Sequence, residues 1–122
     1  NIEYRPYDLI PQSSDVRRLD VQVECPDQGS DVVTMLGVAE YLDELHEILH
    51  RLARGTRYLI ISYTASDFSS YTPERLKELG WRHHKSQAEF EGILTQAGLL
   101  IQKCVITDNR RTLLWLCAKS IG

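Results

Sequence analysis

Apolar residues from Ser30 onward follow two spacings, and each spacing predicts a different element. The short run Ser30–Met35 contains the β-branched neighbours Val32 and Val33, which favours a strand. After it, apolar residues recur with the 3.6-residue period of a helix that buries one face, at Val38, Tyr41, Leu42, Leu45, Ile48, Leu49 and Leu52. The run Tyr58–Ser62 is nearly continuous, which is typical of a parallel strand buried on both faces. The pattern predicts a βαβ unit with a right-handed crossover.

Two further helices are predicted by their end signals. Thr72 and Pro73 are typical of an N-cap and a first helical position, and Gly80 is typical of a helix end. Ser86 and Glu89 form a capping-box pattern, followed by an apolar face and a stop at Gly98. We therefore expect a short helix and then a longer one after the βαβ unit.

The chain then has two β-rich runs, Leu99–Thr107 and Thr112–Lys119, separated by the turn-forming tetrad 108–111. This predicts an antiparallel hairpin at the end of a mostly parallel sheet. Before Ser30, the segments Asn1–Tyr7 and Val16–Val21 are possible strands. No repeat or long linker divides the chain, so we expect residues 1–122 to form a single α/β domain with helices packed on the sheet.

Composition narrows the function classes. Of 122 residues, 43% are hydrophobic and 25% charged, which predicts a folded domain rather than a disordered chain. A net charge of -3 gives no broad attraction to nucleic acid or anionic lipid, and no apolar run approaches the roughly 20 residues that span a bilayer. The three cysteines form no CxxC pair, so we expect buried thiols and a reducing cytoplasm rather than disulfides or a metal site.

Several strings resemble the class I S-adenosylmethionine-dependent methyltransferases, which have a Rossmann-like sheet. Residues 30–42, S-D-V-V-T-M-L-G-V-A-E-Y-L, are similar to that family's fourth strand and the loop and helix after it. Tyr58–Tyr63 resembles the fifth strand, and residues 90–99, ending A-G-L, resemble the last helix before the sixth strand. A final strand that inserts antiparallel is also the family's order. The resemblance covers Asp8 to Lys119.

The resemblance implies a set of donor-binding residues. Asp8 stands where the family's second strand ends in an acid that binds the ribose hydroxyls, and Asp20 where an acid at the third strand accepts from the adenine amino group. Leu36 and Gly37 form the loop after the fourth strand, which passes the donor. Strand ends of this kind line the ligand crevice of an open α/β sheet. The implied cofactor is S-adenosylmethionine, and no metal is implied.

One feature departs from the family: the chain has no glycine-rich G-x-G loop. We expect that the domain is truncated before Asn1, that the first strand and its loop lie upstream, and that this fragment binds the donor weakly or not at all and is inactive. The fourth strand would then have an unpaired edge, which predicts a homodimer or strand-swapped oligomer.

Other polar residues allow alternative interpretations. His46 and His50 have the i, i+4 helical spacing that could supply two ligands of a zinc site. They fall on the polar face of the predicted helix, however, and we interpret them as solvated. His83 or His84 would either orient a methyl acceptor and take its proton, or be exposed beside a packed Trp81. Ser62 lacks the G-x-S-x-G motif of a hydrolase.

Two functions follow from these patterns. The first is a methyltransferase, represented here by a fragment, that transfers a methyl group to a small-molecule or saccharide acceptor. The second is a non-catalytic methyltransferase-like module that mediates self-association or partner binding, because the fold alone does not decide between them.

Overall fold

The computed structural model describes residues 7–8, 14, 17–18 and 30–120. In these ranges the elements are β1 (Tyr7–Asp8), β2 (Arg17–Arg18), β3 (Ser30–Met35), the 3-10 helix η1 (Ala39–Tyr41), α1 (Leu45–Gly55), β4 (Thr56–Thr64), α2 (Pro73–Leu79), α3 (Gln87–Gln96), β5 (Leu99–Ile106) and β6 (Thr112–Lys119). The described parts of the two strands expected before Ser30 are β1 and β2, and the remaining parts lie outside the described residues. No described helix is long and apolar enough to cross a membrane.

A mixed four-stranded sheet has the order β3-β4-β6-β5. β3 and β4 are parallel, with Met35 opposite Ile61, whereas β6 is antiparallel to both of its neighbours. The predicted βαβ unit and the terminal hairpin are therefore confirmed, and β6 is inserted between β4 and β5. A separate parallel pair joins β1 and β2, with Asp8 opposite Arg18.

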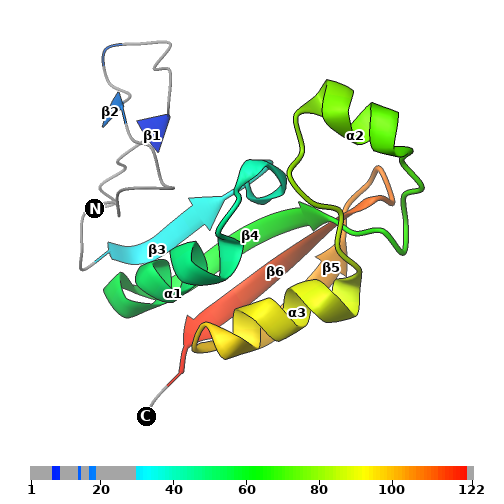
Figure 1. The fold of residues 1–122 in the computed structure, drawn as a ribbon. Coiled ribbons are helices and arrows are strands. Elements are labelled where there is room, and N and C mark those ends of the chain that lie inside the picture. Colours follow the sequence, from blue (N-terminus) through cyan, green and yellow to red (C-terminus); the bar gives the residue numbers. More distant parts are fainter. Residues whose placement is uncertain (1–6, 9–13, 15–16, 19–29, 121–122) are drawn as a thin grey trace.

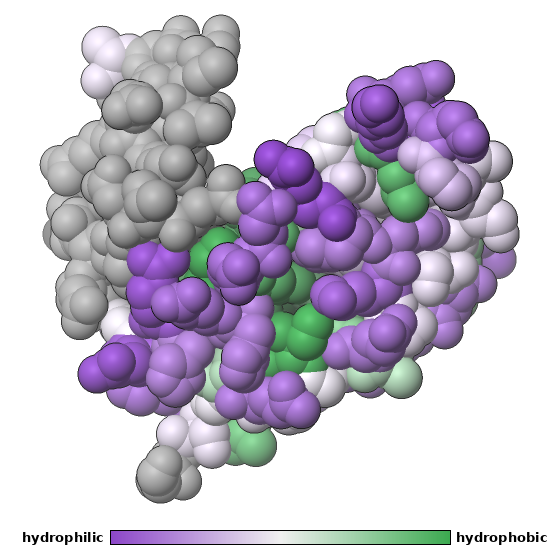
Figure 2. Space-filling model, in the orientation of Figure 1, coloured by the Kyte–Doolittle hydropathy of each residue, from purple (hydrophilic) through white to green (hydrophobic). Residues whose placement is uncertain are grey.

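α1 and α3 lie on the same face of this sheet (Figure 1). Most strand residues that point toward them are buried, among them Leu59, Ile61, Tyr63, Leu113, Trp115 and Cys117. Alternate residues point to the opposite face because strand side chains alternate. Many of them are exposed or only partly buried there, whereas Ser62 and Thr64 at the end of β4 are buried. We call this opposite surface the open face and define it by Tyr58, Ile60, Lys103, Val105, Leu114 and Leu116. The molecular surface over α1 and α3 is mainly hydrophilic, as their amphipathic patterns require (Figure 2).

The structure divides the helix that the apolar period predicts from Val38 to Leu52. η1 ends at Tyr41, Leu42 has an extended backbone (ψ 128°), and α1 begins at Leu45. Leu42 is nevertheless buried, and its carbonyl oxygen accepts a hydrogen bond from His83 Nε2 at 2.8 Å. A continuous helix would use that carbonyl within the helix. The prediction of one helix was wrong because a contact distant in sequence takes the carbonyl.

The end signals of the other two helices are confirmed. Thr72 accepts from the Arg75 amide at the start of α2, and Gly80 ends α2 with φ of 75°. Ser86 and Glu89 form both hydrogen bonds of the capping box at the start of α3. These caps set the ends of the segment 80–86, which crosses the carboxyl end of β4.

Candidate functional site

The loop after β3 is held by a hydrogen bond to the neighbouring strand. Gly37 has φ of 69°, a left-handed conformation that disfavours residues with a Cβ, although a Cβ there would meet no atom of the described residues within 4 Å. Its amide donates to Ser62 Oγ on β4 at 2.8 Å, while Leu36 beside it is 58% exposed. Ser62 thus has a structural partner in the loop after β3. The loop presents an apolar side chain and an unobstructed glycine at the carboxyl end of β3.

The remaining donor-site residues from the sequence are only partly described. Asp8 is the last residue of β1, and Asp20 lies outside the described residues. The proposed grouping of Asp8 and Asp20 with the Gly37 loop therefore stays a prediction.

Glu40 is a buried acid that the sequence analysis did not select as a site residue. It is 3% exposed, and its Oε2 accepts the Thr64 amide hydrogen bond at 2.9 Å. Its backbone carbonyl accepts from the Arg82 amide at 2.8 Å. Its Oε1 is buried and has no hydrogen-bond partner among the described residues. Glu40 therefore joins η1 to the end of β4 and to the segment after α2, with one acceptor atom unused.

Tyr63 and His83 form a hydrogen-bonded pair beside Glu40. Because a carbonyl only accepts, His83 Nε2 carries the proton that it donates to Leu42, so Nδ1 accepts from the Tyr63 hydroxyl at 2.8 Å. The same hydroxyl oxygen accepts from the Lys85 amide at 2.8 Å. Burial lowers the pKa of His83 and raises the pKa of Tyr63 to about 12, which favours these neutral forms. Both nitrogens of His83 serve to hold the segment 81–85 in place.

His84 lies in a cluster with two aromatic rings. The ring centroids of His84 are 5.7 Å from Tyr71 and 5.9 Å from Trp81, and those two rings meet edge to face at 5.3 Å. His84 Nε2 is buried without a partner in the described part of the chain, and burial lowers its pKa. Of the two interpretations given for His83 and His84, the one with exposed rings is wrong, since both side chains are partly buried. The neutral ring of His84 retains a nitrogen for a further hydrogen bond.

The other candidate residues do not gather into a site. His46 and His50 are exposed on α1, as expected. Cys117 is buried and Cys104 partly buried, and burial raises the pKa of both thiols, which disfavours a reactive thiolate; Cys25 lies outside the described residues. Within the described ranges no group of three or more histidine, cysteine or acidic residues is placed to hold a metal ion.

No protein-family model and no curated protein matches the sequence. Solved structures do match the fold. The mitomycin 7-O-methyltransferase MmcR has a TM-score of 0.67 and is 18% identical, with 86% of this chain and 34% of MmcR covered. The magnesium protoporphyrin IX methyltransferase ChlM from Synechocystis PCC 6803, solved with bound SAH, has a TM-score of 0.63 and is 20% identical, with 86% of this chain and 51% of ChlM covered.

A pericyclic reaction enzyme also matches, at a TM-score of 0.63 and 15% identity, with 91% of this chain and 32% of that enzyme covered. The fold is therefore a partial Rossmann-like fold of the class I methyltransferase type, as the sequence resemblance predicted. The chain spans about a third of the length of the first of these structures. At such identities the likeness concerns the fold, which can host different reactions.

We predict that Glu40→Ala lowers the free energy of unfolding by about 1–3 kcal/mol, because the Thr64 amide loses its acceptor in a buried place. Glu40→Gln keeps an acceptor oxygen for Thr64 and replaces an already unpartnered Oε1, so its cost is expected to be smaller. Urea unfolding of both variants at pH 7 measures the difference. Equal costs for the two variants would contradict this role.

We also predict that protonation of His83 weakens the fold. Its folded pKa lies below the unfolded value of 6.5, so its contribution is fully present above about pH 6.5 and is lost as pH falls from there through the folded pKa. Urea unfolding between pH 7.5 and 5 should show a smaller loss of stability in His83→Gln than in the native chain. His46→Gln, changed on an exposed helix face, is the matched control and should keep the native pH dependence.

Proposed function

We propose that this chain is the second half of an S-adenosylmethionine-dependent methyltransferase domain, whose whole protein transfers a methyl group to a small-molecule or saccharide acceptor in the cytoplasm. The observation that supports this most is the strand arrangement: a parallel β3–α1–β4 unit with β6 inserted antiparallel between β4 and β5. Methyltransferases such as MmcR and ChlM match this arrangement. The acceptor kind rests on the modest negative charge, which offers nucleic acid and membranes no broad attraction.

The loop after β3 fits one side of a nucleoside-containing donor. Leu36 offers an exposed apolar side chain, and Gly37 leaves free space beside it. Ser62 fixes the loop conformation through the Gly37 amide. In our proposal Asp8 binds the ribose hydroxyls and Asp20 accepts from the adenine amino group. A glycine-rich loop in a segment upstream of Asn1 would complete the proposed site.

The donor's sulfonium, when bound, supplies a methyl group that is ready for direct transfer, and the protein contributes position and proton removal. His84 is our candidate for the general base that removes the proton of the acceptor. Its Nε2 has no partner among the described residues, and its lowered pKa keeps the ring neutral near pH 7. A neutral imidazole nitrogen can accept the proton of an acceptor hydroxyl. The Glu40, Tyr63 and His83 contacts hold the segment that carries His84 against the strand ends.

A non-catalytic module is the second candidate. β3 is an edge strand of the four-stranded sheet, and an edge offers unpaired backbone groups to another chain. The upstream sequence discriminates between the two functions, because a strand followed by a G-x-G loop supports catalysis.

We predict that the 122-residue chain binds S-adenosylmethionine weakly or not at all, since the glycine-rich half of the site is missing from its sequence. A longer chain that includes the upstream segment should bind it at least about tenfold more tightly, which corresponds to about 1.4 kcal/mol. Isothermal titration calorimetry measures both affinities. Low-micromolar binding of S-adenosylmethionine by the 122-residue chain would refute the explanation that a missing glycine-rich loop weakens binding. Absence of binding by the longer chain would refute the proposed methyltransferase function.

In that longer protein, His84→Gln should lower kcat by about 10²–10⁴, the usual contribution of a general base, while leaving the donor Kd unchanged. His46→Gln is the matched control and should leave both values unchanged. An unchanged kcat in His84→Gln would show that His84 is not the general base.

A further inference from the structure

α2 is attached to the protein differently from α1 and α3. The structure describes all of α2, and none of its residues is buried, whereas α1 and α3 bury apolar residues such as Leu49 and Phe90. Figure 1 shows α2 beyond the carboxyl end of β4, away from the sheet face that the other two helices cover. Burial of apolar surface therefore contributes little to holding α2 against the sheet with α1 and α3, which we call the body.

The polar contacts of α2 are internal to its own segment. Thr72 Oγ1 accepts from the Arg75 amide at 3.1 Å, and the Trp81 amide donates back to the Leu76 carbonyl at 3.0 Å. Among the described residues, no hydrogen bond or ion pair links α2 to a residue outside 72–81. The helix is thus a self-contained unit that polar contacts do not fix to the body.

Three rings close the base of this unit. Tyr71, just before α2, meets Trp81 edge to face with ring centroids 5.3 Å apart, and its centroid lies 5.7 Å from that of His84. The centroids of Trp81 and His84 are 5.9 Å apart. Tyr71 and Trp81 are only partly buried, and single ring pairs of this kind are weak. The contacts that hold the unit closed can therefore separate without unfolding the body.

The chain on both sides of this unit is fixed to the body. Before it, Asp67 accepts a backbone amide hydrogen bond at the start of α3, at 2.6 Å. After it, the Arg82 amide donates to the Glu40 carbonyl at 2.8 Å. Trp81 stands at the boundary, because its amide donates to α2 and the next amide donates to the body. Residues 71–80 are therefore the part that can move, with a pivot at Trp81.

His84 lies at the contact that such a movement would open. Its Nε2 is buried and has no hydrogen-bond partner in the described part of the chain, and the Tyr71 ring beside it belongs to the movable residues. The proposed function makes His84 the general base, so the acceptor has to reach a nitrogen that is covered in this structure. Access to His84 therefore requires that neighbouring groups move.

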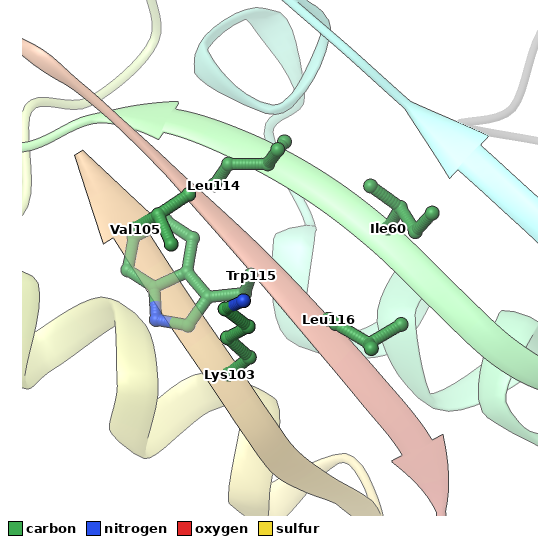
Figure 3. A pocket seen from close by; sticks show the side chains of 6 residues that line it. All are labelled: Ile60, Lys103, Val105, Leu114, Trp115 and Leu116. Atoms are coloured by element: carbon green, nitrogen blue, oxygen red, sulfur yellow. The ribbon is translucent and has the colours of Figure 1, made fainter. Parts of the chain in front are cut away.

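The hollow on the open face does not supply this access. Its volume is about 250 Å³, and none of the residues that line it belongs to segments 71–80 or 81–85. Figure 3 shows its lining on the strands: Ile60, Lys103, Val105, Leu114, Trp115 and Leu116. The route to His84 is instead at the ring contact of Tyr71.

We propose that residues 71–80, which include α2, form a lid that pivots at Trp81, separates the Tyr71 ring from Trp81 and His84, and so admits the methyl acceptor to His84. The role in acceptor access rests on the function proposed above, whereas the movement of the lid does not. Opening breaks only ring contacts, so closed and open forms differ little in buried surface.

Distances between two nitroxide labels, measured by pulsed electron–electron double resonance, test the movement in the 122-residue chain. One pair joins the lid to the body through Lys77→Cys and Glu47→Cys, and the control pair joins α1 to α3 through Glu47→Cys and Gln96→Cys. All three positions are exposed. Serine replaces Cys25 and Cys104 in both labelled chains, so that only the introduced thiols react.

Tyr71→Ala should raise the ratio of open to closed lids at least about fivefold, because it removes the ring contacts with Trp81 and His84. The lid pair should then show a second, different distance, while the control pair keeps one distance and so confirms that the body is folded. Tyr58→Ala, which removes an exposed ring on β4, is the matched control and should leave both pairs unchanged. One unchanged lid distance in the native chain and in Tyr71→Ala would overturn the lid.

The access of His84 is read from its carbethoxylation by diethyl pyrocarbonate, located by mass spectrometry. Tyr71→Ala should raise the rate at His84 at least about fivefold, in step with the open population, while the rate at the exposed His46 stays unchanged. A lid that moves without changing the rate at His84 would overturn its role as a cover. Neither measurement uses donor or acceptor, so their outcome is separate from the calorimetry and the kcat of His84→Gln, which test methyl transfer.

Discussion

The Tyr63 side chain joins the apolar core to the polar contacts at the strand ends, and the rest of the site depends on it. Its ring is fully buried, stacks on Phe90 of α3 at 4.2 Å, and lies 5.6 Å from the ring of His83. Its hydroxyl reaches beyond the core to His83 and the Lys85 amide. One residue of β4 therefore fixes both the position of α3 and the path of the segment 81–85, so packing and site geometry cannot change independently.

The two loops at the carboxyl ends of β3 and β4 are fixed by different means. Gly37 is held through its amide by Ser62, which leaves its surface free, whereas the segment 81–85 is held through buried side chains. A preorganised loop loses less entropy when it meets a ligand, since its conformation is already set. Both loops are preorganised in this sense, which suits the roles proposed above for the Gly37 loop and for His84.

Local signals allowed most of the fold to be predicted, and distant contacts explain what was missed. The capping box of Ser86 and Glu89 and the β-rich runs of the hairpin act between near neighbours, so the sequence displays them directly. The break at Leu42 depends on the hydrogen bond from His83, which is 41 residues away in the sequence. The Glu40 carboxylate accepts a hydrogen bond from the Thr64 amide, which is 24 residues away. In a helical period Glu40 falls outside the apolar positions, so the pattern gave no reason to expect its burial. The sequence signal that could have selected Glu40 was its position as an acidic residue shortly after the predicted strand Ser30–Met35.

The two uncovered parts of the sheet have different consequences for function. The β3 edge adjoins the Gly37 loop, so a strand added there would extend the ligand crevice, which in open α/β sheets lies where strands on both sides of a switch point end. The open face lies on the side of the sheet opposite α1 and α3, and neither Leu36 nor Gly37 is among the residues that define it. Under the proposed function, donor affinity should therefore depend on what pairs with β3. The edge and the open face meet at β4, which pairs with β3 and contributes Tyr58 and Ile60 to the open face.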